Sequence, residues 1–219
     1  MTSIDTEPAE PLPAAERGFN LGLPDGFHGL PIDQSDVAGA DAATSFTEDI
    51  GGIFGLSADD ENAQAAAAVF VGLGLAASRQ GLDYAAIAYY LSPDDPTRPI
   101  MILLTGYVAP SDHSHPADAV ANLRQDLVAD AGTSVHDLRL PIGPAVASVS
   151  EEQDQVVVEE YPFPVLTRQL TAWAPDPDGA AIGVVTVTTN SFQDWERVCT
   201  VGLDIFDTFE WEPLGATSS

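Results

Sequence analysis

The chain has 219 residues and a formal net charge of −27 at pH 7, with 34 acidic residues against seven basic ones. All seven basic residues are arginines, so the chain contains no lysine. This charge repels phosphate backbones and anionic membrane surfaces, which excludes a conventional nucleic-acid binder and a polybasic membrane ligand. The missing lysine excludes Schiff-base chemistry through a lysine and a Walker-type phosphate loop.

The composition is that of a globular protein, with 45% hydrophobic and 19% charged residues. A single cysteine, Cys199, excludes an intrachain disulfide. The first residues do not resemble a secretory signal, and the most apolar window, residues 65–77, is shorter than the roughly 20 residues of a membrane helix. We therefore expect a cytoplasmic protein without membrane insertion. The acidity itself has two readings, a mark of genome and habitat or a surface that steers a basic partner.

The ends of the chain are expected to be irregular, with a disordered tail at residues 1–17 and a frayed tail at 214–219. Residues 18–213 are predicted to form one domain, in which residues 37–80 are helical. A helix over Val37–Phe54 is indicated by Phe46, Ile50 and Phe54 at spacings of four. A second helix is predicted from Ala58 to Gln80, with Ser57 as its N-cap and Gly81 ending it. Gly72 and Gly74 within that helix indicate close approach of another backbone.

The rest of the chain alternates strand patterns with single helices. Two short strands are predicted within Phe19–Ile32 around the turn Pro24-Asp25-Gly26. Three further hairpins are predicted, of Leu82–Leu91 with Pro99–Ala109, Pro144–Ser150 with Gln155–Pro162, and Val165–Ala174 with Ala181–Thr189. A helix at Pro116–Ala131, a single strand at Val135–Leu140 and an extended end at Thr208–Glu212 are also predicted. The last predicted helix spans Phe192–Phe206, with Ser191 as its cap and an inward face of Trp195, Val198, Leu203 and Phe206. This order predicts an α+β fold, an antiparallel sheet of about six or seven strands with helices packed on it.

The second half of the chain resembles a known fold. Its strand ending in LRLPIGPAV and its closing segment VTVTTNSFQDWERVCTVGLDIFDTFEWEP are similar to the Mog/PsbP-like fold, in particular to LpqN-type and DcrB-like actinobacterial proteins, over Leu82–Pro213. The resemblance implies an α/β/α sandwich around an antiparallel sheet. It also implies a binding or adaptor role, because members of that fold mostly bind other proteins.

One segment has the composition of a metal site. Asp112, His113 and His115 stand together, and His-x-His places two imidazoles on the same side of an extended chain, within reach of one ion. The alternative is a polar loop before the helix that begins at Pro116, with Ser114 or His115 as its cap. Cys199 lies within an amphipathic helix and is expected to be a structural thiol rather than a nucleophile.

Aromatic residues near turns and prolines are the remaining candidates for function. Trp173, Tyr161, Phe163 and Trp211 are candidate partner-binding residues, since aromatic side chains often anchor interfaces. The leading hypothesis is a non-enzymatic, chaperone-like adaptor without a cofactor, which binds another protein in a secretion or other multiprotein assembly. A basic protein is one candidate partner, because the acidic chain would attract it. The alternatives are a metal-dependent hydrolase centred on Asp112, His113 and His115 and a structural subunit of a larger assembly.

Overall fold

The structure is a computed structural model and describes residues 17–32, 47–49, 51–52, 55–57, 59–158 and 161–213. Its elements, in chain order, are β1 (Phe19–Asn20), β2 (Phe27–Gly29), α3 (Glu61–Arg79), β3 (Tyr84–Ser92), β4 (Asp95–Pro110), α4 (Pro116–Ala129), β5 (Ser134–Leu140), β6 (Gly143–Val158), β7 (Tyr161–Pro175), β8 (Ala181–Thr189), the 3-10 turn η1 (Phe192–Asp194), α5 (Trp195–Phe206) and β9 (Glu210–Trp211). The tail predicted at residues 1–17 (apart from Arg17), the tail at 214–219 and most of the helix predicted over Val37–Phe54 lie outside the described residues. Of that helix, residues 47–49 and 51–52 have helical backbone.

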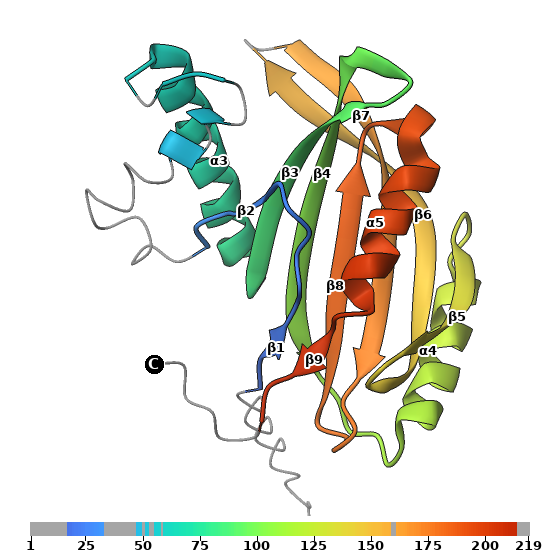
Figure 1. The fold of residues 1–219 in the computed structure, drawn as a ribbon. Coiled ribbons are helices and arrows are strands. Elements are labelled where there is room, and N and C mark those ends of the chain that lie inside the picture. Colours follow the sequence, from blue (N-terminus) through green and yellow to red (C-terminus); the bar gives the residue numbers. More distant parts are fainter. Residues whose placement is uncertain are drawn as a thin grey trace, which may run out of the picture.

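Seven strands form one antiparallel sheet, in the order β2-β3-β4-β8-β7-β6-β5 (Figure 1). The strand β8 lies between β4 and β7 and so joins the β3–β4 hairpin to the β5–β6–β7 meander. A separate pair of short strands, β1 and β9, brings the two ends of the described chain together. The α+β fold predicted from the sequence is confirmed.

Helices cover both faces of the sheet (Figure 1). The cross-strand row Thr105–Thr186–Thr171–Ser148 marks one face across β4, β8, β7 and β6. On this face α3 packs at one end, against Ala85 and Ile87 of β3, and α4 lies at the other, where Leu127 and Ser148 border the same hollow. The opposite face carries α5 and the extended N-terminal segment with Phe19 and Phe27.

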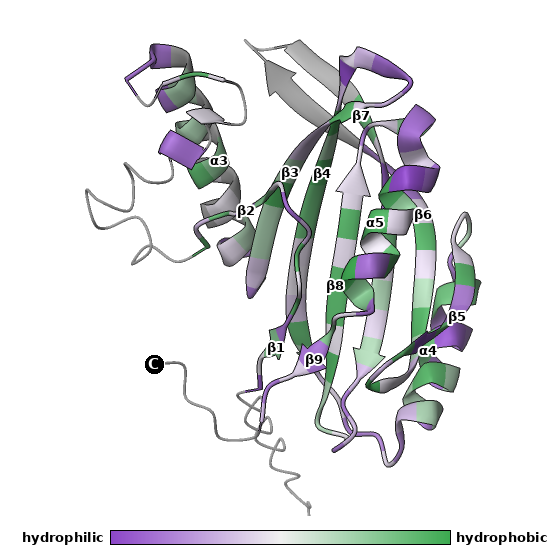
Figure 2. Ribbon diagram, viewed as in Figure 1, coloured by the Kyte–Doolittle hydropathy of each residue, from purple (hydrophilic) through white to green (hydrophobic). Residues whose placement is uncertain are grey.

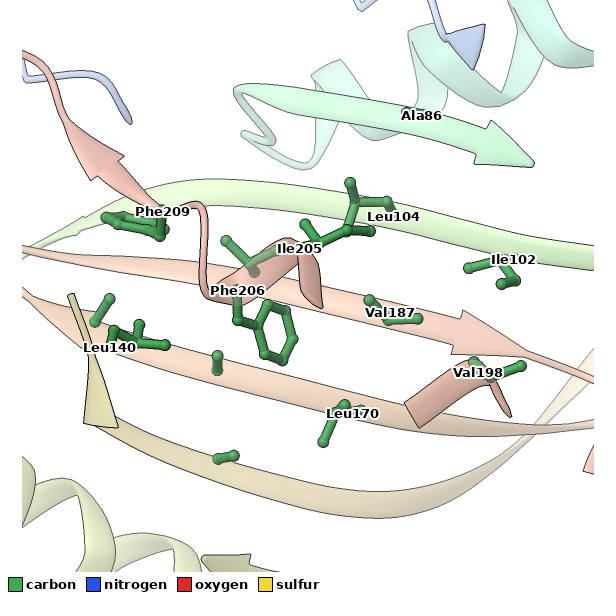
Figure 3. Packing of buried hydrophobic residues seen from close by; sticks show 14 of the residues in the cluster. Ala86, Ile102, Leu104, Leu140, Leu170, Val187, Val198, Ile205, Phe206 and Phe209 are labelled. Atoms are coloured by element: carbon green, nitrogen blue, oxygen red, sulfur yellow. The ribbon is translucent and has the colours of Figure 1, made fainter. Parts of the chain in front are cut away.

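The main core lies between the sheet and α5 (Figure 3). Apolar and polar residues alternate along the central strands, as Figure 2 shows for β6 and β8, because successive side chains point to opposite faces. The face under α5 receives Ile102, Leu104, Leu170 and Val187, which pack against a helix stripe that includes Val198, Ile205 and Phe206.

The meander differs from the prediction. The hairpin predicted from Pro144–Ser150 and Gln155–Pro162 is wrong, because β6 continues as one strand from Gly143 to Val158 and pairs with β7 along its length. The polar residues that suggested a turn have partners on β7: Glu151 accepts hydrogen bonds from Arg168, and Glu152 accepts one from Gln169 at 2.9 Å. A polar run that is stabilised from the neighbouring strand has no signature within its own segment.

The second predicted helix begins three residues late, at Glu61, and ends as expected. Gly81 has a φ of 78°, and the Leu82 N–H donates to the Ala77 carbonyl at 3.2 Å, the bond of a Schellman C-cap. Close approach is confirmed at Gly74, where a Cβ would collide with the Pro31 carbonyl oxygen. At Gly72 it is wrong, because a Cβ there would meet no described atom within 4 Å. None of the described helices is long and apolar enough to cross a membrane.

The last helix also departs in detail from the prediction. One 3-10 turn precedes α5, and Ser191 makes no side-chain capping bond. Val198 and Phe206 are buried as predicted and Trp195 is half-buried, but Leu203 is 41% exposed. Leu203 is five residues after Val198, about 140° around a helix, so Ile205 takes the inward position instead.

Candidate functional site

The β3–β4 hairpin places two polar side chains beneath the start of α5. The tight turn at Pro93-Asp94 closes the hairpin, and Asp95 stabilises it by accepting hydrogen bonds from the Thr97 N–H at 3.0 Å and the Thr97 hydroxyl at 2.6 Å. These bonds hold the pKa of the Asp95 carboxyl below its usual value. Ser92 and Arg98 flank the turn, and both side chains bond Asp194, the residue immediately before α5.

Asp194 is a buried carboxylate that is fully hydrogen-bonded. Its Oδ1 accepts from the Ser92 hydroxyl at 2.8 Å and from Arg197 Nη1 at 3.0 Å. Its Oδ2 accepts from Arg98 Nε at 3.1 Å and forms an ion pair with Arg98 Nη2 at 3.0 Å, and the side chain has no exposed area. Arg98 Nη2 donates its hydrogen bond to the Ser92 hydroxyl oxygen at 2.9 Å. Burial raises the pKa of this carboxyl, but the bonds from Ser92 and Arg98 and the two positive charges outweigh it, so the pKa lies below its usual value.

Arg197 continues this network to the surface. Its Nη1 lies 2.9 Å from Asp94 Oδ2 at the hairpin turn, and both carboxylates raise the pKa of the guanidinium, with the Asp94 hydrogen bond contributing most. Arg197 thus clamps the first turn of α5 to the tip of the β3–β4 hairpin. Glu196, next to it and exposed, has no ion pair with any residue that the structure describes.

An apolar pocket of about 180 Å³ opens beside this clamp. The hairpin contributes Tyr90, Leu91, Pro93, Ile100 and Ile102, and α5 contributes Arg197, Val198 and Val201. Ile102 and Val198 come from facing elements, β4 and α5 (Figure 3). Leu91 is 66% exposed, the highest exposure among the described large apolar side chains.

Arg197 also lines a second, polar hollow of about 560 Å³. Its lining consists of Asp94, Gln193, Asp194, Glu196, Arg197 and Thr200. Three carboxylates and one guanidinium therefore line this hollow, and the guanidinium is bonded to two of the carboxylates, Asp94 and Asp194. The apolar pocket and the acidic hollow share Arg197 in their linings, and together they are here called the hairpin–α5 site.

The predicted metal residues lie elsewhere, in the loop before α4. The Nε2 of His113 lies 2.9 Å from the Asp176 carbonyl oxygen and its Nδ1 lies 2.8 Å from the Ser111 hydroxyl. Because a carbonyl only accepts, Nε2 carries the proton, and Nδ1 of the neutral ring accepts from Ser111. A metal at His113 would have to displace one of these bonds.

The other two predicted ligands are exposed, and His115 occupies the N-cap position of α4 without a side-chain capping bond. No cluster of three or more His, Cys, Asp or Glu side chains suited to a metal ion occurs in the described part of the chain.

The predicted aromatic residues do not form one surface. Trp211 is half-buried on the α5 face, edge-on to Phe209 at 5.3 Å, with the Arg17 guanidinium 5.3 Å from its ring centre. Trp173 is half-buried on the opposite face, in a hollow of about 350 Å³ beside α4. Tyr161 and Phe163 belong to β7 by their backbone, but their side chains lie outside the described residues.

Cys199 faces partly inward on α5. Burial raises the pKa of its thiol, which the nearby Arg168 partly opposes and Glu196 reinforces. A thiol with a raised pKa is a poor nucleophile, consistent with the structural role predicted for it. Arg168 itself is held between the rings of Phe192 and Trp195, at 4.9 and 5.2 Å.

Sequence reasoning missed the residues that make up the hairpin–α5 site. Ser92 and Asp194 are separated by 102 positions, and no local pattern links them. In the sequence, the site is marked only by the turn motif Pro93-Asp94-Asp95 next to Leu91. Such a motif is common to many hairpins and does not by itself indicate a site.

Comparison with known proteins leaves the family open. No protein-family model and no curated protein matches the chain. Among solved structures, the chain is similar to the crystal structure of LpqN, which is involved in cell envelope biogenesis of Mycobacterium tuberculosis, with a TM-score of 0.40 and 12% identity over 94% of this chain and 87% of that chain. A likeness of this strength does not assign a family, so membership of the wider Mog/PsbP-like fold stays a prediction.

Proposed function

We propose that the protein is a binding protein that uses the hairpin–α5 site to hold a partner protein. The observation that carries the proposal is the open apolar pocket with Leu91 at its rim, 66% exposed. An exposed apolar side chain costs free energy in water, and covering the exposed two thirds of Leu91 with a partner recovers about 1–2 kcal/mol, two thirds of the value for a whole leucine. An engineered apolar cavity of about 150 Å³ holds benzene, so a pocket of about 180 Å³ accepts one leucine or phenylalanine side chain.

The clamp around Asp194 supports this role by keeping the pocket open. Both walls of the pocket end in the same network, because Ser92 and Arg98 belong to the hairpin and Arg197 belongs to α5. A preformed pocket loses little conformational entropy when a partner side chain enters it.

Site-directed photo-crosslinking in the native host tests the proposal. A benzophenone amino acid at position 91 is expected to trap a discrete partner protein. The matched control is the same amino acid at Val128, which is 62% exposed on α4, away from the site. The proposal fails if position 91 gives no adduct, or only the adducts that position 128 gives.

The trapped partner then provides an affinity measurement. Leu91→Asp is expected to weaken its binding roughly tenfold, because the lost apolar contact is worth about 1–2 kcal/mol and a tenfold change corresponds to about 1.4 kcal/mol. Val128→Asp is expected to leave the affinity unchanged, and an equal loss from both variants would contradict the assignment of the site.

A further inference from the structure

The two halves of the hairpin–α5 site differ in chemistry, and this difference constrains what can bind. The pocket is lined almost wholly by apolar side chains, whereas the lining of the hollow includes Asp94, Asp194 and Glu196. A partner segment that occupies both must therefore present an apolar group to the pocket and a group compatible with carboxylates to the hollow.

The arginines do not neutralise the hollow. Asp194 is compensated by Arg98 and Arg197, and Arg197 also bonds Asp94. Glu196 is left without an ion pair among the described residues, and Asp94 is 66% exposed beside a guanidinium that it shares. The hollow therefore presents negative charge at its rim, where a lysine or arginine would find acceptors.

Resting on the proposed function, we propose that the occupant is a partner segment with a leucine-like side chain next to a basic residue. The apolar side chain enters the pocket, and the basic side chain reaches Glu196 and Asp94 in the hollow. The net charge of −27 favours the same kind of partner at long range, because it attracts basic segments and repels acidic ones. The same charge repels a second copy of this chain, so a second copy is disfavoured as the occupant.

The test uses blocked hexapeptides and the full-length, ¹⁵N-labelled protein. Four peptides share a serine and glycine background and carry Leu-Arg, Leu-Gln, Leu-Glu or Ser-Arg at their centre. In NMR titrations the Leu-Arg peptide is expected to shift the amides of Leu91 and Val201, which line the pocket. At low salt it is expected to bind roughly two- to fivefold tighter than Leu-Gln, the size of an exposed ion pair, and the preference should shrink as salt is added.

A matched pair of variants separates the charge contribution from folding. Glu196→Gln is expected to remove most of the preference for Leu-Arg over Leu-Gln. Asp126→Asn, an exposed acid on α4, is expected to preserve the preference. Because both side chains are exposed, neither substitution is expected to disturb the fold.

The possible failures are distinguishable. Equal binding of Leu-Arg and Leu-Gln, unaffected by Glu196→Gln, overturns the basic partner but leaves apolar docking intact. If neither Leu-Arg nor Leu-Gln shifts the pocket amides, the proposed function itself fails at this site. Tighter binding of Leu-Glu overturns the inference, as do concentration-dependent shifts of the same amides without peptide, which would assign the pocket to a second copy of the chain.

Discussion

At the scale of single residues, three of the seven arginines bond carboxylates that are fully buried. Asp176 and Asp194 have no exposed side-chain area, and each is bonded by arginine. Arg17 lies 2.6 Å from both oxygens of Asp176, while Arg98 and Arg197 bond Asp194. An unpaired buried carboxylate is very unfavourable, so the few cations of this acidic chain stabilise the fold at these two positions.

Asp194→Asn is expected to lower stability and to flatten its dependence on pH. The folded-state pKa of Asp194 is lowered, so its contribution is present above the unfolded-state value near 3.8 and is lost as pH falls through the folded-state pKa. Urea unfolding from pH 6 down to pH 2.5 measures this effect. The wild-type protein should lose more stability across the acid range than the variant does.

The exposed acid Asp204, also on α5, provides the control for this measurement. Asp204→Asn should retain the wild-type acid slope. An Asp194→Asn slope equal to that of wild type would contradict the lowered pKa.

At the scale of elements, α3 and α5 belong to different cores. Among the side chains that the structure describes, α3 packs through Ala67 and Phe70 in a buried cluster of five residues, whereas α5 belongs to one of seventeen. Close backbone approach partly compensates for this difference, because Gly74 lets α3 lie directly on the segment at Pro31.

Two glycines of α3 are expected to respond in opposite directions to alanine. Gly72→Ala should stabilise the protein by about 0.5–1 kcal/mol, because alanine has the higher helix propensity and its methyl group meets open space. Gly74→Ala should destabilise it, because the methyl group would collide with the Pro31 carbonyl. Chemical denaturation of both variants measures the difference, and stabilisation by Gly74→Ala would show that the two backbones are not in contact.

Native-state hydrogen exchange should show that α3 opens more readily than α5. Local opening costs less where fewer apolar contacts are lost, so amides in the middle of α3 should exchange faster than those of Val201–Ile205 in α5. Amides of β8, the centre of the sheet, are the internal reference for global unfolding. Equal protection in α3 and β8 would mean that the small cluster unfolds together with the sheet.

At the scale of the whole molecule, repulsion among the negative charges lowers the stability of the folded state. A net charge of −27 on 219 residues means that folding brings many carboxylates closer together. The acids that the structure describes are mostly exposed, at turns such as Pro93-Asp94 and at helix starts such as Glu61, where solvent and counterions screen them.

Salt is therefore expected to stabilise the protein. Raising NaCl from 10 mM to 0.3 M should increase the Tm by roughly 2–5 °C, because the Debye length falls below the typical spacing of surface charges. The rise should level off once screening is complete. Differential scanning calorimetry at fixed pH measures it, with sucrose at equal osmolality as the control, and a flat or falling Tm would show that self-repulsion is unimportant.

The accuracy of sequence-based prediction varied with the range of the interactions involved. The helix α4, the C-terminal end of α3 and the turn of the β3–β4 hairpin follow from local signals such as Pro116, Gly81 and Pro93-Asp94. The continuous β6 does not, because its polar stretch is held by Arg168 and Gln169 of β7. The candidate site was unpredictable for the same reason. Ser92 and Arg98 of the hairpin contact Asp194 only because α5 packs on the sheet and brings its first residues to the hairpin.

Taken alone, the sequence determined the fold class, the order of most elements and the absence of lysine chemistry from this chain, because periodicity, turn residues and composition act locally or add over the whole chain. That the net charge keeps the protein from binding nucleic acid stays a prediction. The tertiary structure decided which strands are neighbours, which faces Trp173 and Trp211 occupy and which two carboxylates of the described residues are buried against arginine. Those outcomes depend on side chains far apart in the chain competing for the same contacts. The hairpin–α5 site arises at this level, because its pocket and its hollow are each lined by the β3–β4 hairpin and by the segment at α5. These segments are about one hundred residues apart and are joined through Arg98, Asp194 and Arg197.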